Sequence, residues 1–306
     1  MPRTTIFSLL LAGLAAGCGG SSSGGGGGAA STTAAPVSSS TPAPATTATS
    51  TLPTGVVEVL SYNVAGLPQG ISSSDPVRNI PQISPLLNAY ELVLVQEDFW
   101  YHVELARDAR HPFQSPPLVG HSTPMNDGLN TFSESPFHSL TRVKWSRWHG
   151  LFNHSSDGLA SKGFTFARHV FGPGVEVDVY NLHADAGRDQ GDIDARRAQF
   201  AQLATFIEAF SVDRPLIVAG DTNLKATTPQ DEVILVDFMA RVGLADAART
   251  IGGLPETIDR VMLRSTADVA LAPLRWRFAD EFVDAAGGPL SDHKAVHVAV
   301  EWQRLR

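Results

Sequence analysis

Short apolar runs that end in polar side chains recur along most of the chain, and they constrain its fold more than any other feature. These runs have the length of β-strands, and polar residues at strand ends point to a cleft and not to a core. They read VEVLSYN, ELVLVQE, VEVDVYNLH, PLIVAGDTN and ETIDR, and SDH opens a last run, KAVHVAVEW. The polar positions are Asn63, Glu97, His183, Asp221, Asn223, Asp259, Asp292 and His293. Their arrangement is typical of a catalytic site.

Segments with helical periodicity alternate with these strands. We predict helices at 80–90, 192–210 and 231–242, and in the second helix apolar residues recur at helical spacing (Ala198, Leu203, Phe206, Ile207 and Phe210). The predicted strands cover 57–63, 92–96, 163–168, 175–182, 216–219, 257–263 and 295–302. Mixed strands and helices around a large core indicate an α/β (α+β) protein, with layered sheets flanked by helices.

The first 18 residues have the composition of an export signal. Arg3 precedes an apolar stretch at 6–16, which is shorter than the roughly 20 residues that span a bilayer. Cys18 follows LAAG, which resembles the lipobox of bacterial lipoproteins, although Ala15 stands where a larger aliphatic residue is usual. We therefore predict an exported protein that is anchored in the cell envelope through an acylated Cys18. In the alternative, the signal is simply cleaved with its unpaired thiol and the protein is secreted.

Residues 19–54 consist almost entirely of Gly, Ser, Thr, Ala and Pro, without any charge. Such a segment cannot bury enough apolar surface to offset the entropy lost on ordering, so we predict a flexible tether. Residues 55–306 contain no second break of this kind and are long enough for one domain with a substantial core. This body has no cysteine, so the core must stabilise it without disulfides.

The body is acidic. Without Arg3 the chain keeps 22 basic and 31 acidic residues, a formal charge of −9. An acidic body argues weakly against a protein that must neutralise many nucleic-acid phosphates. The argument is weak because a metal-loaded cleft can be locally positive inside an acidic shell.

Taken together, the motifs LSYNVAGLP, VQED, NLHAD, AGDTN, IDR and LSDHKAV resemble, in order and spacing, the endonuclease/exonuclease/phosphatase superfamily. The resemblance covers the whole body. Within the superfamily, the segment DGLASKGF at 157–164 resembles the D-x-L-x-x-K-G-hydrophobic segment of bacterial neutral sphingomyelinases, and the first motif is also similar to that branch. The IDR segment at 258–260 is equally similar to the deoxyribonuclease I and inositol-phosphatase branches.

The resemblance implies a deoxyribonuclease I-like, four-layered sandwich of two packed mixed β-sheets flanked by helices. It also implies hydrolysis of phosphate esters with a divalent metal, usually Mg²⁺, with Mn²⁺ or another divalent cation as the alternative. Glu97 is then the principal ligand, Asn63 assists it, and Asp292 helps to hold the metal or the second histidine; oxygen ligands suit magnesium better than zinc. Without this role, Glu97 is a solvated strand-end carboxylate and Asn63 a turn residue.

The remaining roles follow from the chemistry of phosphate esters. His293 is our candidate for the general base that deprotonates the attacking water, and Asp259 orients its ring. His183 hydrogen-bonds the phosphoryl group and can protonate the leaving oxygen. Asp221 and Asn223, two residues apart, should point the same way, and the resemblance implies that this pair contacts the water and the phosphate. Any one of these residues could instead be a hydrogen-bonded polar residue at the end of a sheet.

Other residues bear less directly on the site. RVKWSRWHGLF at 142–152 interleaves basic and aromatic residues, which suits lipid headgroups or stacked bases but also an ordinary amphipathic strand and loop. Lys162 either approaches the phosphate pocket or is a solvated turn residue. His297 lies in a predicted strand without a third zinc ligand, and neither His149 nor His154 has support as a ligand.

The sequence thus predicts a monomeric, magnesium-dependent phosphodiesterase of the sphingomyelinase or phospholipase C type, acting on a lipid headgroup at a membrane surface. An extracellular nuclease with nucleic acid as substrate is the second hypothesis, and a phosphomonoesterase is the third. A tethered binding protein whose site has decayed represents a different class. Retention of every expected site residue argues against that last hypothesis.

Overall fold

The computed structural model describes residues 52–120, 125–150 and 160–306. The predicted signal, Cys18 and nearly all of the tether lie outside the described residues, as do 157–159 of the DGLASKGF segment. Ser50–Arg306 forms one compact unit. Within the described part of this unit, no helix has both the length and the apolar character needed to cross a bilayer.

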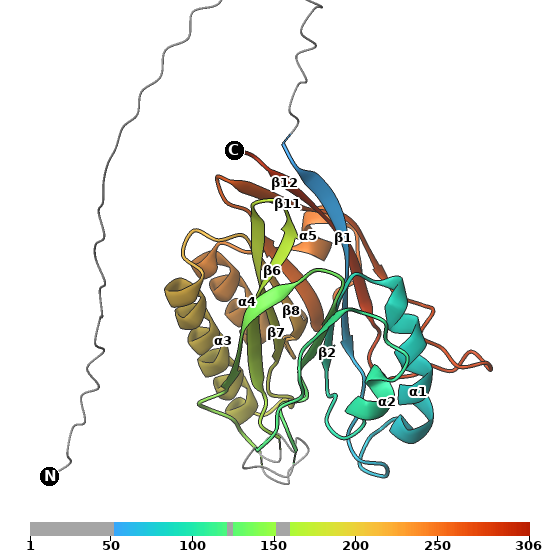
Figure 1. The fold of residues 1–306 in the computed structure, drawn as a ribbon. Helices are drawn as coiled ribbons and strands as arrows, with labels where there is room; N and C mark the ends of the chain where they lie inside the picture. The colour runs from blue at the N-terminus through green and yellow to red at the C-terminus, as the bar shows by residue number, and fades with distance from the viewer. Residues whose placement is uncertain (1–51, 121–124, 151–159) are drawn as a thin grey trace, which may run out of the picture. The chain divides into compact units, whose positions relative to one another are not determined.

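Twelve strands in the described body form two mixed sheets of six strands each (Figure 1). The first sheet contains β1 (Thr54–Asn63), β2 (Leu92–Gln96), β3 (Phe113–Gln114), β4 (Asn130–Ser133), β11 (Val269–Phe278) and β12 (Val296–Arg304), in the order β11-β12-β1-β2-β4-β3. The second contains β5 (Phe137–Lys144), β6 (Gly163–Gly172), β7 (Val175–His183), β8 (Leu216–Asp221), β9 (Ala245–Asp246) and β10 (Asp259–Arg264), in the order β5-β6-β7-β8-β10-β9.

Helices cover the outer face of each sheet (Figure 1). The first sheet is covered by α1 (Pro76–Leu86), the 3₁₀ turn η1 (Leu87–Ala89) and α2 (His102–Ala106). The second sheet is covered by α3 (Gln190–Phe210) and α4 (Pro229–Val242), and the short α5 (Ala247–Ile251) contacts β10 and β11. The result is the four-layered sandwich that the sequence predicted.

Alternation along the strands creates separate apolar cores. In β1, Val57 and Val59 belong to the core between the two sheets, while Leu60 and Tyr62 pack with the residues of α1 on the outer face. Strand side chains point alternately to opposite faces, so an apolar run buried on both sides is expected for a strand inside a four-layered fold.

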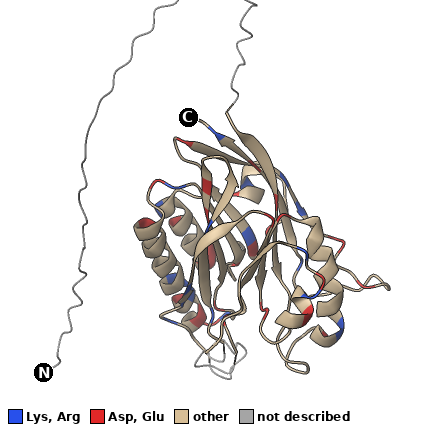
Figure 2. Ribbon diagram, viewed as in Figure 1, with Lys and Arg blue, Asp and Glu red and all other residues tan. Residues whose placement is uncertain are grey.

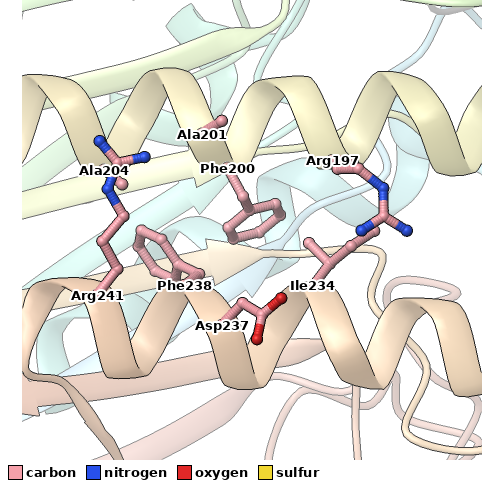
Figure 3. Close-up of a pocket in the computed structure, with 8 residues that line it drawn as sticks. All are labelled: Arg197, Phe200, Ala201, Ala204, Ile234, Asp237, Phe238 and Arg241. Atoms are coloured by element: carbon pink, nitrogen blue, oxygen red, sulfur yellow. The ribbon is translucent and has the colours of Figure 1, made fainter.

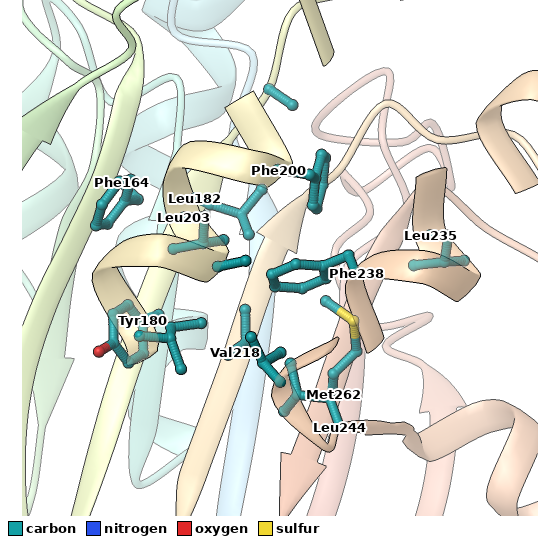
Figure 4. Packing of buried hydrophobic residues seen from close by; sticks show 14 of the residues in the cluster. Phe164, Tyr180, Leu182, Phe200, Leu203, Val218, Leu235, Phe238, Leu244 and Met262 are labelled. Carbon is teal, nitrogen blue, oxygen red and sulfur yellow. The ribbon is translucent and has the colours of Figure 1, made fainter. Parts of the chain in front are cut away.

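The third core lies between the second sheet and helices α3 and α4 (Figure 4). Phe200 of α3 meets Phe238 of α4 edge to face, with ring centroids 5.0 Å apart. Val218 and Met262 close this core from the sheet side. The two aromatic rings thereby fix the spacing of the helices that begin just beyond β7 and β8.

The parallel pairs in each sheet bring polar strand ends together. β1 runs parallel to β2, so Asn63 lies beside Gln96, and β7 runs parallel to β8, so His183 lies beside Asp221. Asp259, the first residue of antiparallel β10, also pairs with Asp221. We call the common edge where β1, β2, β7 and β8 end the polar edge.

Hydrogen bonds across the sandwich hold the two sheets in register near the polar edge. Gln96 Nε2 donates to Asn181 Oδ1 over 2.8 Å, and Asn181 Nδ2 donates to the carbonyl of Val95 over 2.9 Å. All three residues are buried, so these bonds replace hydration that the side chains lose. The strand ends of the two sheets therefore face each other at fixed positions.

Candidate active site

Asn63 lies at the centre of the polar edge. Its Nδ2 atom donates to Glu97 Oε1 and to Asp221 Oδ2, each over 3.2 Å. The backbone N–H of Ala65 donates to Asn63 Oδ1 over 3.0 Å and fixes the direction of the amide. Asn63 therefore joins a carboxylate of the first sheet to a carboxylate of the second.

Glu97 stands just past β2 in a left-handed backbone conformation, with φ of 58°. This conformation is uncommon for residues other than glycine and is frequent at functional sites. A Cβ atom on Gly66 would lie 2.4 Å from the carbonyl oxygen of Glu97, so only glycine fits beside it. The glycine of the first motif thus makes room for the turn that presents Glu97.

His183 is buried between the two carboxylates. Its Nε2 atom lies 3.3 Å from Asp221 Oδ2 and 3.8 Å from Glu97 Oε1. The indole N–H of Trp145 donates to the carbonyl oxygen of His183 over 2.7 Å and fixes this end of β7. Burial lowers the pKa of His183 well below its usual range, and the charges of Lys162 and His293 act in the same direction.

Asp259 and His293 form a hydrogen-bonded pair on the other side of Asp221. His293 Nδ1 lies 2.9 Å from Asp259 Oδ2, and His293 Nε2 points into the cluster, 3.8 Å from Asp221 Oδ2. The loop that carries His293 is fixed by Ser291, whose hydroxyl donates to the carbonyl of Asn63 over 2.7 Å and accepts the backbone N–H of His293.

Asp221 and Asn223 do not point the same way, contrary to the sequence prediction. Asp221 is the last residue of β8, whereas Asn223 has left the strand with φ of 50°. Its side-chain amide donates to the carbonyl of Ala184 over 3.0 Å, and its backbone N–H donates to Asp221 Oδ1. The alternation of a strand does not extend into this turn, so Asn223 contacts the ends of β7 and β8 from the side.

The structure does not bring Asp292 into the cluster. Its carboxylate is exposed and accepts a hydrogen bond from Ser73, and Ser291 lies 3.4 Å away. His293 turns inward in this loop while its neighbour turns outward. The remaining predicted residues, Asn63, Glu97, His183, Asp221, Asp259 and His293, meet at the polar edge.

Burial and repulsion shape the charges of the cluster. Burial raises the pKa of Glu97, against the opposing effects of Lys162 and the Asn63 hydrogen bond. Burial also raises the pKa of Asp221 to about 6, with further repulsion from Asp259. Burial opposes protonation of His293, but the Asp259 and Asp221 carboxylates outweigh it and raise its pKa to about 10. The site therefore concentrates negative charge that water does not screen.

This donor set fits a divalent cation. Asp221, Asp259 and His293 each place a ligand atom within 4.8 Å of the others, and Glu97 adjoins Asp221 through Asn63. Asp259 Oδ1 is buried and has no hydrogen-bond partner in the described structure. Carboxylate and amide oxygens are the ligands that magnesium prefers. A divalent cation would also offset the repulsion that raises the carboxylate pKa values.

Two further residues near the site were ambiguous in the sequence. Lys162 is buried and its charge acts on Glu97, His183 and Asp221, so it is not a solvated turn residue. Trp145 had been grouped with a surface motif, but its ring lies in the core. No local pattern distinguishes a core tryptophan from an exposed one within RVKWSRWHGLF.

The other residues of that motif divide between structure and surface. Arg142 lies in β5 and binds the buried carboxylate of Asp127 at 2.7 Å. Arg147 and Trp148 are exposed, and residues 151–152 lie outside the described structure. His149 Nδ1 lies 2.8 Å from Asp192, while His154 is not among the described residues. The motif as a whole is therefore not one binding strip.

His297 and a groove between two helices are separate from the cluster. His297 lies in β12, where its Nε2 hydrogen-bonds Glu58. The groove runs between α3 and α4 (Figure 3), on the outer face of the second sheet. Apolar rings line its floor, with Asp237 and two arginines around it (Arg197, Phe200, Ala201, Ala204, Ile234, Asp237, Phe238 and Arg241). It contains none of the predicted catalytic residues.

The sandwich and its site define the class of the chain: it has the deoxyribonuclease I-like fold of the endonuclease/exonuclease/phosphatase superfamily. A superfamily protein from Beutenbergia cavernae matches with a TM-score of 0.58 at 17% identity, covering 81% of this chain and 72% of that protein. No protein-family model matches the chain.

Within this class the chain is a homologue of bacterial sphingomyelinases. Sphingomyelinase of Mycobacterium tuberculosis and Mycobacterium bovis is 34% identical over 280 residues, which covers 84% of this chain and 54% of the relative. The chain thus spans about half the length of these relatives.

Solved structures show the same architecture. Sphingomyelinase C from Streptomyces griseocarneus matches with a TM-score of 0.63 at 20% identity, covering 80% of this chain and 99% of that protein. A beta toxin variant from Staphylococcus aureus, solved with bound magnesium ions, matches with a TM-score of 0.61 at 16% identity and covers the same shares. At these identities the likeness concerns the fold.

Proposed function

We propose that the chain is a metal-dependent phosphodiesterase that hydrolyses phosphate esters by in-line attack of water, with sphingomyelin-type lipids as substrate. One observation carries the proposal. Two histidines, three carboxylates and an asparagine from six separate segments converge on one edge of the sandwich, within hydrogen-bonding or ion-pairing distance of one another.

Glu97, Asn63 and Asp221 would hold a divalent cation, with Asp259 nearby. When bound, magnesium would neutralise charge that develops on the phosphoryl oxygens. Asp292 is exposed and bonded to Ser73, so we propose that it acts on the second histidine, His293, through its charge and does not hold the metal. The proposed metal is Mg²⁺, with Mn²⁺ as an alternative of similar ligand preference.

His293 is suited to accept the proton of the attacking water. Its Nδ1–H is directed to Asp259, which leaves Nε2 facing the cluster. The protonated form predominates while the nearby carboxylates keep the pKa near 10. Neutralising those carboxylates lowers the pKa toward working pH, where the ring can act as a base.

His183 is suited to donate a hydrogen bond to the phosphoryl group. Because burial keeps its ring neutral, Nε2–H can stabilise the charge that develops on a phosphoryl oxygen without transferring the proton. This favours the hydrogen-bonding role of His183 over the protonation of the leaving oxygen. Asn223 would hold the ends of β7 and β8 in place during the reaction.

The homology to sphingomyelinases supports a lipid phosphodiester as substrate. An extracellular nuclease with the same catalytic residues is the second candidate, since the superfamily fold also serves nucleases. Nucleic-acid binding favours a continuous basic surface. In the view of Figure 2, basic and acidic residues are interspersed, for example along α3, which favours the lipid substrate.

The proposal extends to the cellular setting. We infer an exported monomer with a catalytic domain at 55–306, a tether at 19–54 and a signal at 1–18. Acylation of Cys18 would hold it at the cell envelope, and simple cleavage would release it. Mass spectrometry of the mature N-terminus distinguishes these outcomes.

The decisive assay compares substrates under one set of conditions. The full chain is incubated with sphingomyelin vesicles, phosphatidylcholine vesicles, plasmid DNA or a simple phosphomonoester, with magnesium or with chelator. We expect magnesium-dependent release of phosphocholine from sphingomyelin and no cleavage of DNA. DNA nicking without lipid cleavage would identify a nuclease, and headgroup binding without turnover at saturating magnesium would indicate a binding protein.

A further inference from the structure

The five tryptophans of the chain fall into two groups. Trp145, Trp276 and Trp302 are buried in the cores, with at most 8% of their surface exposed. Trp100 and Trp148 are 61% and 41% exposed. A large apolar ring left in water forgoes the stabilisation that burial provides, so two such rings call for an explanation at the surface.

Both exposed tryptophans lie at the polar edge, one on each sheet. Trp100 is three residues beyond Glu97, in the loop that follows β2. Trp148 lies between β5 and β6, at the ends where Lys144 pairs with Gly163 and Phe164 pairs with Leu182. The next residue, His149, donates its backbone N–H to Asp185, two residues beyond His183. Each indole is therefore anchored close to a catalytic strand end.

Two exposed aliphatic side chains lie in loops that follow other strands of the first sheet. Ile71 is 66% exposed in the loop between β1 and α1, and Val119 is 81% exposed beyond the end of β3. The loop of Ile71 is tied to that of Trp100, because the backbone N–H of Gln69 donates to the Tyr101 hydroxyl over 3.0 Å. We call Ile71, Trp100, Val119 and Trp148 the apolar rim.

The chemistry of the rim fits the headgroup region of a lipid bilayer. Its members come from four separate loops, those that follow β1, β2 and β3 and the one between β5 and β6, so they are separate apolar side chains and not one continuous patch. Indole rings favour the boundary between water and hydrocarbon. Arg147, beside Trp148, has a side chain that is 58% exposed and can reach a lipid phosphate. A bilayer can accept such scattered tips, whereas a protein partner would need a continuous complementary patch.

We propose that the apolar rim inserts into the headgroup region of a sphingomyelin-containing bilayer and seats the polar edge against it. This inference rests on the proposed lipid phosphodiesterase function. Seating the edge would bring the phosphodiester to Glu97 and His293 without removing the whole lipid from the bilayer. The rim residues would then determine attachment to the surface, and the buried cluster would determine the chemistry.

The test uses the full chain with W100A, W148A and the double variant. The matched control is V212A, which removes a 64% exposed side chain at the far end, between α3 and β8. Binding to sphingomyelin vesicles is measured by co-sedimentation in chelator, where no turnover is needed. Hydrolysis of the water-soluble diester bis(p-nitrophenyl) phosphate with magnesium monitors the site itself.

We expect each single variant to bind vesicles about tenfold more weakly and the double variant at least about 30-fold more weakly, with V212A binding normally. Hydrolysis of the soluble diester should stay within about twofold of the wild type. Vesicle binding by the double variant at wild-type strength would overturn the proposal, as would an equal loss in V212A.

A second measurement does not depend on any variant. Lipids brominated near the boundary of headgroup and acyl chain should quench part of the wild-type tryptophan fluorescence, and W100A/W148A should lose that quenching. Quenching that persists in the double variant would overturn the proposal that the apolar rim inserts into the bilayer. If the rim variants lose binding while the wild type hydrolyses no lipid, the rim stands and the proposed lipid phosphodiesterase function fails.

Discussion

At the scale of single residues, His293 is the group whose position is most specific to chemistry. Its ring is hydrogen-bonded to Asp259, points its other nitrogen at the cluster and contributes little to the cores. We expect His293→Ala to reduce kcat by roughly 10²–10⁴-fold while the melting temperature changes little. Steady-state kinetics and thermal unfolding measure the two effects, with His138→Ala on the exposed start of β5 as control.

A His293→Ala variant that unfolds, or one that keeps a rate near that of the wild type, would remove His293 from the mechanism.

Asp259→Asn tests the partner of His293 without removing the histidine. It keeps the ring nearby but weakens its orientation and the field that raises its pKa, so the acidic limb of the pH–rate profile should move to lower pH. The direction follows because Asp259 is a leading cause of the raised pKa.

Glu97 supports a second prediction at this scale. Glu97→Gln removes a charged oxygen ligand, so the magnesium concentration for half-maximal activity should rise by at least about tenfold. Titration of activity with magnesium gives this value. Glu301→Gln, an exposed carboxylate on β12, should leave it unchanged. An unchanged magnesium requirement in Glu97→Gln would contradict the ligand assignment.

At the scale of elements, a buried ion pair connects the two helices to the loops of the site. Arg196 of α3 donates from Nε and Nη2 to Asp231 of α4, over 3.0 and 2.9 Å. Its Nη1 atom donates to the carbonyls of Asp185 and Gly187, just beyond His183. The backbone N–H of Lys225, just beyond Asn223, reaches the same aspartate. One pair thus holds both loops that follow β7 and β8.

Removing one partner of this ion pair should lower the free energy of unfolding more than replacing both partners with apolar residues. Arg196→Met or Asp231→Leu alone leaves a buried charge without its partner, and we expect each to lose about 3–5 kcal/mol of unfolding free energy. The double variant removes both charges and should recover much of that loss. Urea unfolding measures all three free energies. A double variant as unstable as the sum of the single variants would show that the pair does not act as a unit.

The elements differ in how well the sequence predicted them. Strands that cross both cores were predicted because their apolar residues alternate or run unbroken, as in β1, β2, β7 and β8. β3 and β9 have two residues each, and β11 contains Pro273 and a register shift. β4, β5 and β11 were missed together with these short strands, because pairing with neighbours in the sheet, and not a local pattern, defines them. The helices α2 and α5 were missed because five residues are too few to show a helical period.

The candidate site was also predictable only in part. The residue types could be predicted because each follows an apolar run, and the fold brings the ends of these runs together. The directions of the Asp292 and Asn223 side chains could not be predicted, because both residues lie in turns whose conformation the strand pattern does not govern. The role of Arg196 depends on contacts with three distant segments, and no local pattern indicates them. The functional roles themselves remain predictions for the variants above.

At the scale of the whole molecule, His169 links the two sheets. It lies in β6, is fully buried and sits 3.3 Å from the hydroxyl of Ser133 in β4. Burial lowers its pKa to about 3, and His138 adds to this. The folded protein therefore binds this proton less readily than the unfolded chain, whose histidine has an ordinary pKa of about 6.5. Its contribution is intact above about pH 6.5 and is lost as the pH falls from there toward 3.

By this linkage, the fold should lose about 2 kcal/mol of unfolding free energy at pH 5 through His169 alone. Replacing it by asparagine removes the titrating group, so the stability of His169→Asn should fall less steeply between pH 7 and 5. Denaturant unfolding at several pH values gives the two slopes. Parallel slopes for the variant and the wild type would show that His169 is not the group responsible.

β1 runs from the point where the chain enters the body to the polar edge. The strand begins at Thr54, paired with Gln303 near the C-terminus, and its ten residues end at Asn63 in the polar edge. At about 3.3 Å per residue, the chain enters the body roughly 30 Å from the catalytic cluster. Whatever is joined ahead of Thr54 therefore meets the body at the opposite pole. The entry point of the chain and the polar edge thus lie at opposite ends of one strand, so the attachment at Thr54 leaves the site unobstructed.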